Sequence, residues 1–289
     1  MASKLRAALI QLKTSPIKHE NFTCVASLLR QTVAQNDKLD LVVLPECFNS
    51  PYSVQLFRKH CEASPSGETT QFLSDIAKEH KITLVGGSFP ESDDGVIYNT
   101  SLVFNSSGEI IAKHRKTHLF DVDIPGKISF QESRVLGAGS SNTVFTLPGQ
   151  NRNVGLGICY DLRFPEVAHV ATRAPHNAFM MVYPGAFNTT TGPLHWEPLA
   201  RARAIDNQCY VLMCSPARDL EAKYKAYGHS LVVDPMGKVL MEANKDEQVL
   251  VCEIDPGMVD TVRQNIPTGH QRRFDLYGDV SKDAVVTDI

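Results

Sequence analysis

Short apolar segments rich in β-branched residues alternate with helix-period segments along almost the whole chain, and this alternation restricts the possible folds. The run "LDLVVLP" at residues 39–45 is typical of a buried strand, and Phe22, Val25 and Leu29 recur at helical spacing before it. "FMMVYP" at residues 179–184 is a second apolar run, and it also precedes a helical pattern. Strands that alternate with helices predict an α/β fold.

The pattern occurs twice, in two halves that each contain helices able to cover one face of a sheet. We therefore expect two packed sheets with helices outside them, an α-β-β-α sandwich of four layers. No low-complexity linker divides the chain, so we expect one domain over residues 1–280 and a C-terminal tail at residues 281–289. Residues 117–150 are expected to form a long irregular stretch, of a kind that is more often functional than idle. The expected strands lie at 5–12, 39–45, 81–89, 96–104, 109–116, 152–159, 179–184, 209–215, 228–235 and 248–255.

Composition excludes some classes of partner. Of the 289 residues, 43% are hydrophobic and 21% are charged, which is typical of a globular protein with a sizeable core. The net charge of −3 gives no reason to expect nucleic acid as a partner. No apolar run approaches the ~18 residues that a membrane helix needs, so no membrane partner is expected either.

The seven cysteines are scattered, odd in number and without a C-x-x-C pair, which favours a reducing compartment. We expect a cytoplasmic protein, with mitochondria as an additional location. The phosphate-binding and dinucleotide-binding glycine motifs are absent, and nothing in the sequence calls for a metal or an organic cofactor.

Three reactive residues each end a predicted core strand. Glu46 follows the run at 39–45, Lys116 ends the strand at 109–116, and Cys159 ends the strand at 152–159. Open α/β sheets place their sites at the carboxyl ends of strands, so these side chains can share one site. Taken singly, each has an ordinary explanation: Glu46 can be an exposed acid, Lys116 a solvated lysine and Cys159 a core cysteine.

Together, the three side chains form a complete apparatus for acyl transfer. A thiol needs help to attack at neutral pH, and a carboxylate can accept its proton and return it to a leaving amine. A lysine ammonium can stabilise the oxyanion of the tetrahedral intermediate. His114 and His118 have the spacing of a helical metal pair, but they follow a strand pattern, so we expect two solvated histidines.

The segments around these residues resemble the Glu, Lys and Cys motifs of the nitrilase superfamily of carbon–nitrogen hydrolases. They are "LPECF" at 44–48, "HRKTHLFD" at 114–121 and "GICYDLRFPE" at 157–166, in the order of the family. The resemblance implies an αββα fold and a homodimer. It also implies Glu46 as general base and acid, Lys116 as oxyanion-stabilising group and Cys159 as nucleophile.

Within the superfamily the chain is similar to the omega-amidase branch, through "PECFNSPY" at 45–52, "YPGAFNTTTGPLHW" at 183–196 and "SPARD" at 215–219. This resemblance implies hydrolysis of the terminal amide of 2-oxoglutaramate, and of 2-oxosuccinamate, to the 2-oxo dicarboxylate and ammonia. The family's second glutamate matches Glu132, whose implied role is to hold Lys116 in position.

The carboxylate of such a substrate requires a cation, and Arg163, four residues after Cys159, is the candidate. The alternative is a structural ion pair of Arg163 with Asp161 or Glu166. We expect three aromatic residues to line the substrate pocket, unless they serve only packing: Tyr52, Tyr160 and Phe187.

Three other functions stay open at this point. Deaminated-glutathione amidases share "CYDLRFPE" and "YGHSLVVDP", so these stretches do not separate the two amidase branches. A second alternative is a catalytically silent scaffold or redox sensor with the same fold. Such a protein would not need Glu46, Lys116 and Cys159 together, so their presence argues against it. A plain Cys–His hydrolase would use a histidine such as His229, but no histidine has a supporting motif.

Overall fold

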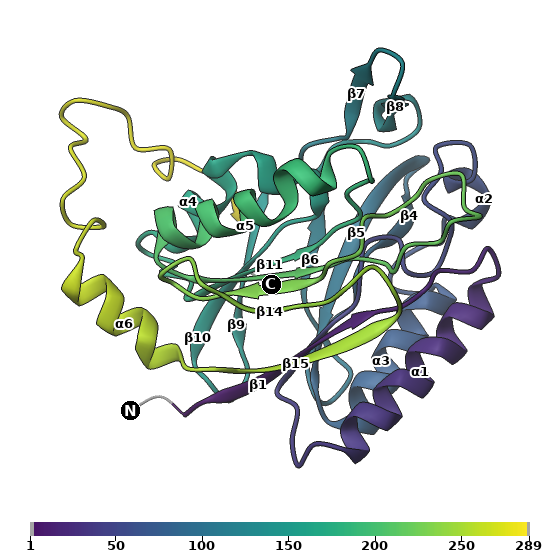
Figure 1. Cartoon of the computed structure of the whole chain (residues 1–289), viewed down its shortest axis with the longest axis horizontal. Coiled ribbons are helices and arrows are strands. Elements are labelled where there is room, and N and C mark those ends of the chain that lie inside the picture. Colours follow the sequence, from purple (N-terminus) through teal and green to yellow (C-terminus); the bar gives the residue numbers. More distant parts are fainter. Residues whose placement is uncertain (1–2, 288–289) are drawn as a thin grey trace.

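The apolar segments form two seven-stranded β-sheets, which lie face to face in the computed structural model of residues 3–287 (Figure 1). The first sheet contains, in spatial order, β15 (Gln248–Ile254), β1 (Leu5–Gln11), β2 (Leu41–Val43), β3 (Thr83–Val85), β5 (Val96–Phe104) and β4 (Phe89–Asp93), with β6 (Ile110–Arg115) also paired to β5.

The strands of the second sheet all begin at or after Asn142. In spatial order it contains β14 (Val239–Glu242), β13 (Leu231–Val233), β12 (Tyr210–Cys214), β11 (Met180–Pro184), β10 (Arg152–Leu156), β9 (Asn142–Leu147) and β16 (Val286–Thr287).

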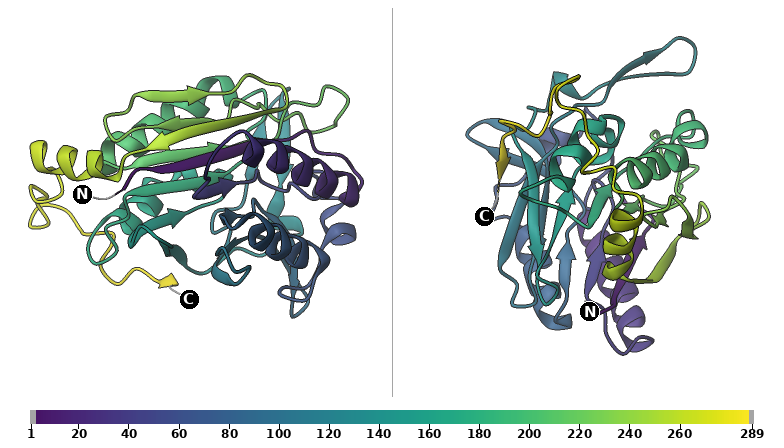
Figure 2. Two further views of the ribbon diagram at one scale, coloured as in Figure 1. Left: turned by 90° about the horizontal axis from the view of Figure 1, so that it is seen from below. Right: turned by 90° about the vertical axis from the view of Figure 1, so that its left-hand side faces the viewer.

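Helices cover the outer face of each sheet. The first sheet carries α1 (Lys18–Ala34) and α3 (Glu68–His80), and the second carries α4 (Pro165–Thr172) and α5 (Gly192–Asn207). Figure 2 shows these layers from two further directions. The described residues also form two other helices, α2 (Phe57–His60) and α6 (Pro256–Asn265).

Three apolar clusters hold the layers together. One lies between the sheets and includes Leu9, Val43 and Leu212, and the other two lie between each sheet and its helices. Val25 and Leu29 of α1 are fully buried, as their helical spacing predicts. The predicted αββα sandwich is confirmed.

The last strand of the first sheet comes from the far end of the sequence. β15 pairs with β1 in antiparallel register from Leu5↔Ile254 to Gln11↔Gln248. The two sheets are therefore not built from two separate halves of the chain, as the repeated pattern suggested. A periodic pattern predicts that a segment is a strand, but it does not identify the strand's neighbour.

The stretch at 117–150 is more regular than we expected. It contains the hairpin β7 (Asp121–Ile124) and β8 (Ile128–Gln131), the short 3₁₀ turn η1 (Glu132–Arg134) and then β9. The hairpin projects beyond the layers in Figures 1 and 2. Its strands alternate between polar and apolar residues but have only four residues each, which is too short a run for periodicity to identify them.

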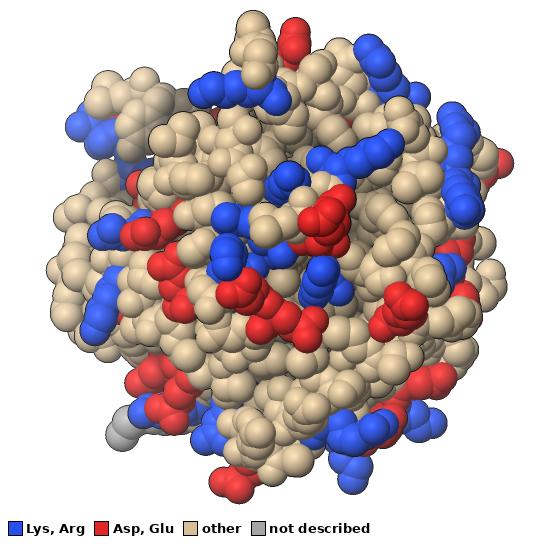
Figure 3. Space-filling model, turned by 45° about the vertical axis from the view of Figure 1, so that its right-hand side comes forward, with Lys and Arg blue, Asp and Glu red and all other residues tan. Residues whose placement is uncertain are grey.

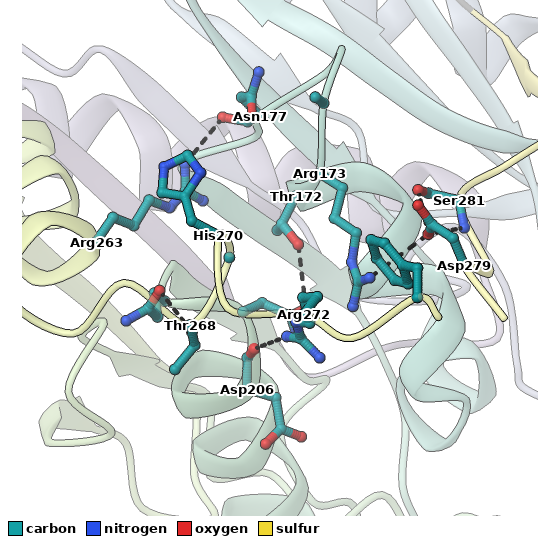
Figure 4. Close-up of a pocket in the computed structure, with 15 residues that line it drawn as sticks. Thr172, Arg173, Asn177, Asp206, Arg263, Thr268, His270, Arg272, Asp279 and Ser281 are labelled. Carbon is teal, nitrogen blue, oxygen red and sulfur yellow. Dashed lines mark hydrogen bonds and ion pairs between the residues drawn. The ribbon is translucent and has the colours of Figure 1, made fainter. Parts of the chain in front are cut away.

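The segment after α6 returns across the helices of the second sheet. It lines a cavity of about 270 Å³ together with the ends of α4 and α5 (Figure 4). Arg272 donates a hydrogen bond to the backbone carbonyl of Asp206, and Arg173 pairs with Asp279 at 3.6 Å. Within the expected tail at 281–289, β16 pairs with β9, whereas residues 288 and 289 lie outside the described residues. The division into one domain and a tail stays a prediction.

Three general properties bear on the partners. None of the helices in residues 3–287 is long and apolar enough to cross a membrane. Basic and acidic side chains are interspersed on the face shown in Figure 3. The described part of the chain contains no group of three or more His, Cys, Asp or Glu side chains placed to hold a metal ion.

Candidate active site

The ends of three strands bring Glu46, Lys116 and Cys159 into one buried site. Glu46 follows β2, Lys116 follows β6, and Cys159 begins the 3₁₀ turn η2 (Cys159–Arg163) after β10. β2 and β6 belong to the first sheet and β10 to the second, so the site lies where the two sheets meet. Glu46 and Lys116 are at most 1% exposed, and Cys159 is 5% exposed.

Lys116 lies between two carboxylates. Its Nζ is 3.0 Å from Oε1 of Glu46 and 2.9 Å from Oε2 of Glu132. Asn99 of β5 donates a second hydrogen bond to Oε1 of Glu46, at 2.9 Å. Oε2 of Glu46 is buried and has no hydrogen-bond partner among the described residues, so it can accept a proton from a nearby group.

Glu132 is held from two further directions. The Tyr52 hydroxyl donates to its Oε1 at 2.6 Å, and the backbone N–H of Phe120 donates to its Oε2 at 2.7 Å. The same Tyr52 oxygen is 3.4 Å from Nζ of Lys116. Tyr52, which we expected in the pocket wall, therefore belongs to the polar network around the lysine.

The backbone presents Cys159 in an unusual conformation. Its φ is +47°, in the left-handed region that non-glycine residues rarely occupy. The backbone N–H of Ala186, just after β11, lies 3.4 Å from Sγ. Such strain persists only where the surroundings hold it, and it is commonly found at functional sites.

Burial and charge set the proton affinities of the site. Burial first, and then the negative charge of Glu46, raise the pKa of the Cys159 thiol well above its usual value, although the Lys116 ammonium opposes them. Burial, with the charge of Glu132, also raises the pKa of Glu46 despite the nearby Lys116. Burial alone would lower the pKa of Lys116, but the charges of Glu132 and Glu46 raise it well above the usual value. Lys116 is therefore a permanent cation in this site.

Arg163 ends the turn that Cys159 begins, and the two side chains line the same small cavity. Its guanidinium carbon lies 4.6 Å from the ring centroid of Phe187, and its Nη1 donates to Nδ1 of His195 at 3.1 Å. Within residues 3–287 it forms no ion pair, and its buried Nε has no partner. The alternative, a structural pair with Asp161 or Glu166, is not formed among the described residues, and Asp161 instead contacts His114 and His118.

Aromatic side chains surround the thiol. The small cavity is lined by Phe120, Tyr160, Phe187 and Tyr224, together with Cys159, Arg163, Ala186 and Thr191. The larger neighbouring cavity, of about 460 Å³, reaches Glu46 and Tyr52 and shares Ala186 and Tyr224 with the first. Tyr224 stands between the two cavities and donates a hydrogen bond to the carbonyl of Ala186.

His114 and His118 are not two solvated residues, as we expected. His114 is 1% exposed, and its Nε2 lies 3.0 Å from Oδ2 of Asp161. Nδ1 of His118 lies 2.8 Å from Oδ1 of the same carboxylate. The expectation treated both histidines as the exposed end of a strand, but His114 lies within β6 and His118 lies beyond its end.

Histidine is not part of the thiol's surroundings. His229, which a Cys–His hydrolase would need, instead pairs with Glu242 at 3.0 Å. Within the described residues, neither of the two cavities is lined by a histidine.

Sequence reasoning did not identify Asn99, Tyr224 or the backbone N–H of Ala186. Asn99 is a polar residue within the apolar strand β5, which is the one signal that was available for it. Tyr224 lies in an irregular segment without periodicity, and the Ala186 N–H has no side-chain signature at all.

The chain is similar to known amidases over nearly its whole length. The family model for carbon-nitrogen hydrolases matches residues 6–264. Omega-amidase NIT3 of Saccharomyces cerevisiae is 50% identical, with 97% of each chain covered, and omega-amidase NIT2 of Mus musculus is 52% identical over 97% of this chain and 99% of its own.

The crystal structure of Saccharomyces cerevisiae Nit3, a member of branch 10 of the nitrilase superfamily, has the same fold. The TM-score is 0.86 at 46% identity, over 95% of this chain and all of the other. The C. elegans NitFhit protein gives a TM-score of 0.84 at 33% identity, over 96% of this chain and 67% of the other. These similarities confirm the resemblance inferred from the three motifs, and the chain belongs to the carbon–nitrogen hydrolase family, the nitrilase superfamily.

Proposed function

We propose that this protein is an omega-amidase that hydrolyses the terminal amide of 2-oxoglutaramate, and of 2-oxosuccinamate, through a thioester on Cys159. The observation that carries the proposal is the placement of Arg163, a cation without a carboxylate partner among the described residues, in the cavity that holds Cys159. The similarity to two proteins named omega-amidase supports it.

The first half of the reaction forms the thioester and releases ammonia. Glu46 accepts the proton of the Cys159 thiol as Sγ attacks the amide carbonyl carbon. Lys116, with the backbone N–H of Tyr160, stabilises the oxyanion, and the Ala186 N–H beside Sγ is a further donor. Glu46 then gives its proton to the amide nitrogen, so the C–N bond breaks and ammonia leaves.

The second half restores the enzyme. Glu46 accepts a proton from water as the water oxygen attacks the thioester carbonyl. The C–S bond then breaks, the acid product leaves, and the proton on Glu46 returns to the Cys159 thiolate. Glu132 does not react in this scheme; it holds Lys116, as its 2.9 Å ion pair allows. No metal or organic cofactor takes part.

Arg163 gives the site its preference for an acid. A guanidinium binds a carboxylate through two parallel hydrogen bonds, and the aromatic faces of Phe187 and Tyr160 keep water from competing. We assign Tyr160 and Phe187 to the pocket wall. Tyr52 lines the neighbouring cavity next to Glu46.

The proposed function also bears on the partner, the cellular location and the oligomeric state of the protein. The partner is a small-molecule amide of a 2-oxo acid, rather than a nucleic acid or a membrane. All seven cysteines are free thiols in the structure, which supports a cytoplasmic location. A homodimer is proposed from the family, and α5 exposes Leu194 and Ile205, 66% and 52% accessible, as candidates for its interface.

The test is ammonia release from three substrates: 2-oxoglutaramate, deaminated glutathione and a simple aliphatic nitrile. We expect the highest kcat/KM with 2-oxoglutaramate. Cys159→Ala should remove at least ~10⁴-fold of the activity, as loss of a nucleophile does in other hydrolases. Cys209→Ala, which removes a buried thiol outside both cavities, should leave the activity unchanged.

Two results would contradict the proposal. A preference for deaminated glutathione would assign the chain to the sister branch. The absence of turnover with all three substrates, from a folded protein, would favour the silent scaffold.

A further inference from the structure

The carboxylate of Asp161 is fully buried and accepts hydrogen bonds from two separate segments of the chain. Oδ2 accepts the backbone N–H of Ile158 at 2.9 Å and faces Nε2 of His114 at 3.0 Å. Oδ1 accepts the Thr117 hydroxyl at 2.7 Å and the backbone N–H of His118 at 2.9 Å, and it faces Nδ1 of His118 at 2.8 Å. An ionised carboxylate only accepts hydrogen bonds, so the two ring nitrogens that face it carry hydrogens.

The two segments are those that carry the lysine and the thiol of the site. Thr117 directly follows Lys116 at the end of β6, in the first sheet. Ile158 directly precedes Cys159, after β10 in the second sheet. Asp161 thus joins the two sheets at the point where their reactive side chains meet.

We propose that Asp161 is a positioning residue, which fixes the Cys159 turn against the Lys116 segment so that the thiol meets Glu46. This inference rests on the proposed function and extends it to a residue that does not touch the substrate. It also gives a role to the histidine pair, whose ring N–H groups hold the carboxylate.

Two further observations support this role. Cys159 is held at a φ of +47°, and such a conformation needs several independent contacts around it. Burial alone would raise the pKa of Asp161, but the hydrogen bonds from His114 and His118 lower it far below the usual value. The carboxylate therefore stays ionised, and able to accept every one of these bonds, throughout the working pH range.

The experiment is Asp161→Asn in the full-length protein, read by kcat, KM and the alkylation of Cys159 by iodoacetamide, followed by peptide mass spectrometry. The NH₂ group of the new asparagine would face hydrogen-bond donors that the carboxylate oxygen accepted before. This clash of donors should displace the turn that carries Cys159. We expect kcat to fall about 10- to 100-fold, as a displacement near 1 Å causes. KM should change less than kcat, because the Arg163 side chain also has contacts with His195 and Phe187, which lie outside this turn.

Alkylation of Cys159 should slow about 10-fold, because a displaced thiol loses the base that takes its proton. This readout needs no substrate. A wild-type protein that fails to hydrolyse 2-oxoglutaramate would overturn the proposed function, while the alkylation rates would still test the role of Asp161.

The matched control is Asp234→Asn. Asp234 is a buried carboxylate that accepts backbone N–H groups of Met236 and Lys238, in the turn between β13 and β14. This variant should lower thermal stability and leave kcat and Cys159 alkylation unchanged. The control therefore distinguishes the general effect of removing a buried carboxylate from the specific effect of removing Asp161.

Thr117→Val is the second variant, for the case in which Asp161→Asn does not fold. It removes one donor, keeps the Asp161 charge, and should lower kcat in the same direction by a smaller factor. Folded Asp161→Asn protein with wild-type kcat and alkylation would overturn the proposal. If only Thr117→Val folds, wild-type values for that variant would overturn it.

Discussion

At the scale of single residues, Lys116 is a buried cation between two buried carboxylates, Glu46 and Glu132. Burial raises the pKa of Glu46; the Lys116 ammonium opposes this rise, and the negative charge of Glu132 offsets part of that opposition. A carboxyl group with a raised pKa is a stronger base than an ordinary glutamate. The second carboxylate therefore both holds the lysine and prepares Glu46 to accept the thiol proton.

This arrangement predicts the acid limb of the pH–rate profile. Glu46 must be ionised to act as a base, so kcat/KM rises as pH increases through its pKa. Because that pKa is raised, we expect the inflection above the ordinary glutamate value of about 4.3. The measurement is kcat/KM for 2-oxoglutaramate across the acid range, with circular dichroism to verify that the fold persists. An inflection at the ordinary value would contradict the argument that burial, with the charge of Glu132, raises this pKa.

The residue scale also predicts the effect of Arg163→Lys. A lysine keeps the positive charge, but its single ammonium group cannot form the two parallel hydrogen bonds that a guanidinium forms with a carboxylate. We expect KM for 2-oxoglutaramate to rise about 10-fold or more, which corresponds to ~1.5–3 kcal/mol for a hydrogen bond to a charged group. The kcat should change less.

A neutral amide of similar size provides the control for Arg163→Lys, because its binding does not need the guanidinium. Equal losses for the acidic and the neutral amide would show that Arg163 does not bind the carboxylate.

At the scale of elements, the link between β10 and η2 is packed too closely for any side chain at Gly157. A Cβ there would lie 2.7 Å from Cε1 of Tyr183 and 3.3 Å from Cβ of Asp161. Tyr183 belongs to β11 and is fully buried, so it has no room to move aside. Glycine in this motif serves the close approach of two strands next to the thiol.

We therefore expect Gly157→Ala to lower the free energy of unfolding by about 1–3 kcal/mol, as overpacking does in other cores. Activity should fall as well, because the displaced backbone carries Cys159. Urea denaturation and ammonia release measure the two effects. Gly269→Ala, where an added Cβ has no neighbour within 4 Å, should change stability by less than about 0.5 kcal/mol. Equal stability of the two variants would contradict the packing argument.

At the scale of the whole molecule, the helix layer over the second sheet leaves apolar side chains in contact with water. Leu194 on α5 and Leu276 in the C-terminal segment are 66% and 70% exposed. Burial of such side chains stabilises an assembly by roughly 25 cal/mol for each Å² of apolar surface. A second copy of the chain, related by a two-fold axis, is the partner that we propose for this layer.

Light scattering after size-exclusion chromatography tests this proposal. We expect wild-type protein to elute as a dimer and Leu194→Glu to shift toward the monomer, because a buried, unpaired carboxylate opposes association. Ile17→Glu replaces another exposed apolar residue, 54% accessible, at the start of α1 on the opposite layer. That control should stay dimeric. A monomeric wild type would contradict the dimer.

Sequence alone predicted the α/β class and the four layers, and it singled out Glu46, Lys116 and Cys159, which the fold brings together in one buried site. Periodicity is a local property, and Glu46, Lys116 and Cys159 each follow a strand whose apolar run can be read directly. The motifs around them were sufficient to identify the family, because each combines a reactive side chain with the turn that positions it.

Tertiary structure decided what depends on contacts between distant segments. It placed β15 beside β1, ordered the hairpin of β7 and β8, and directed both His114 and His118 to Asp161. Pairing, burial and hydrogen bonding depend on which residues meet in space, and no local pattern in the chain records that. The same reason explains Arg163: its sequence neighbour Asp161 could have paired with it, but the fold engages that carboxylate with His114 and His118, and the guanidinium lines the cavity of the thiol.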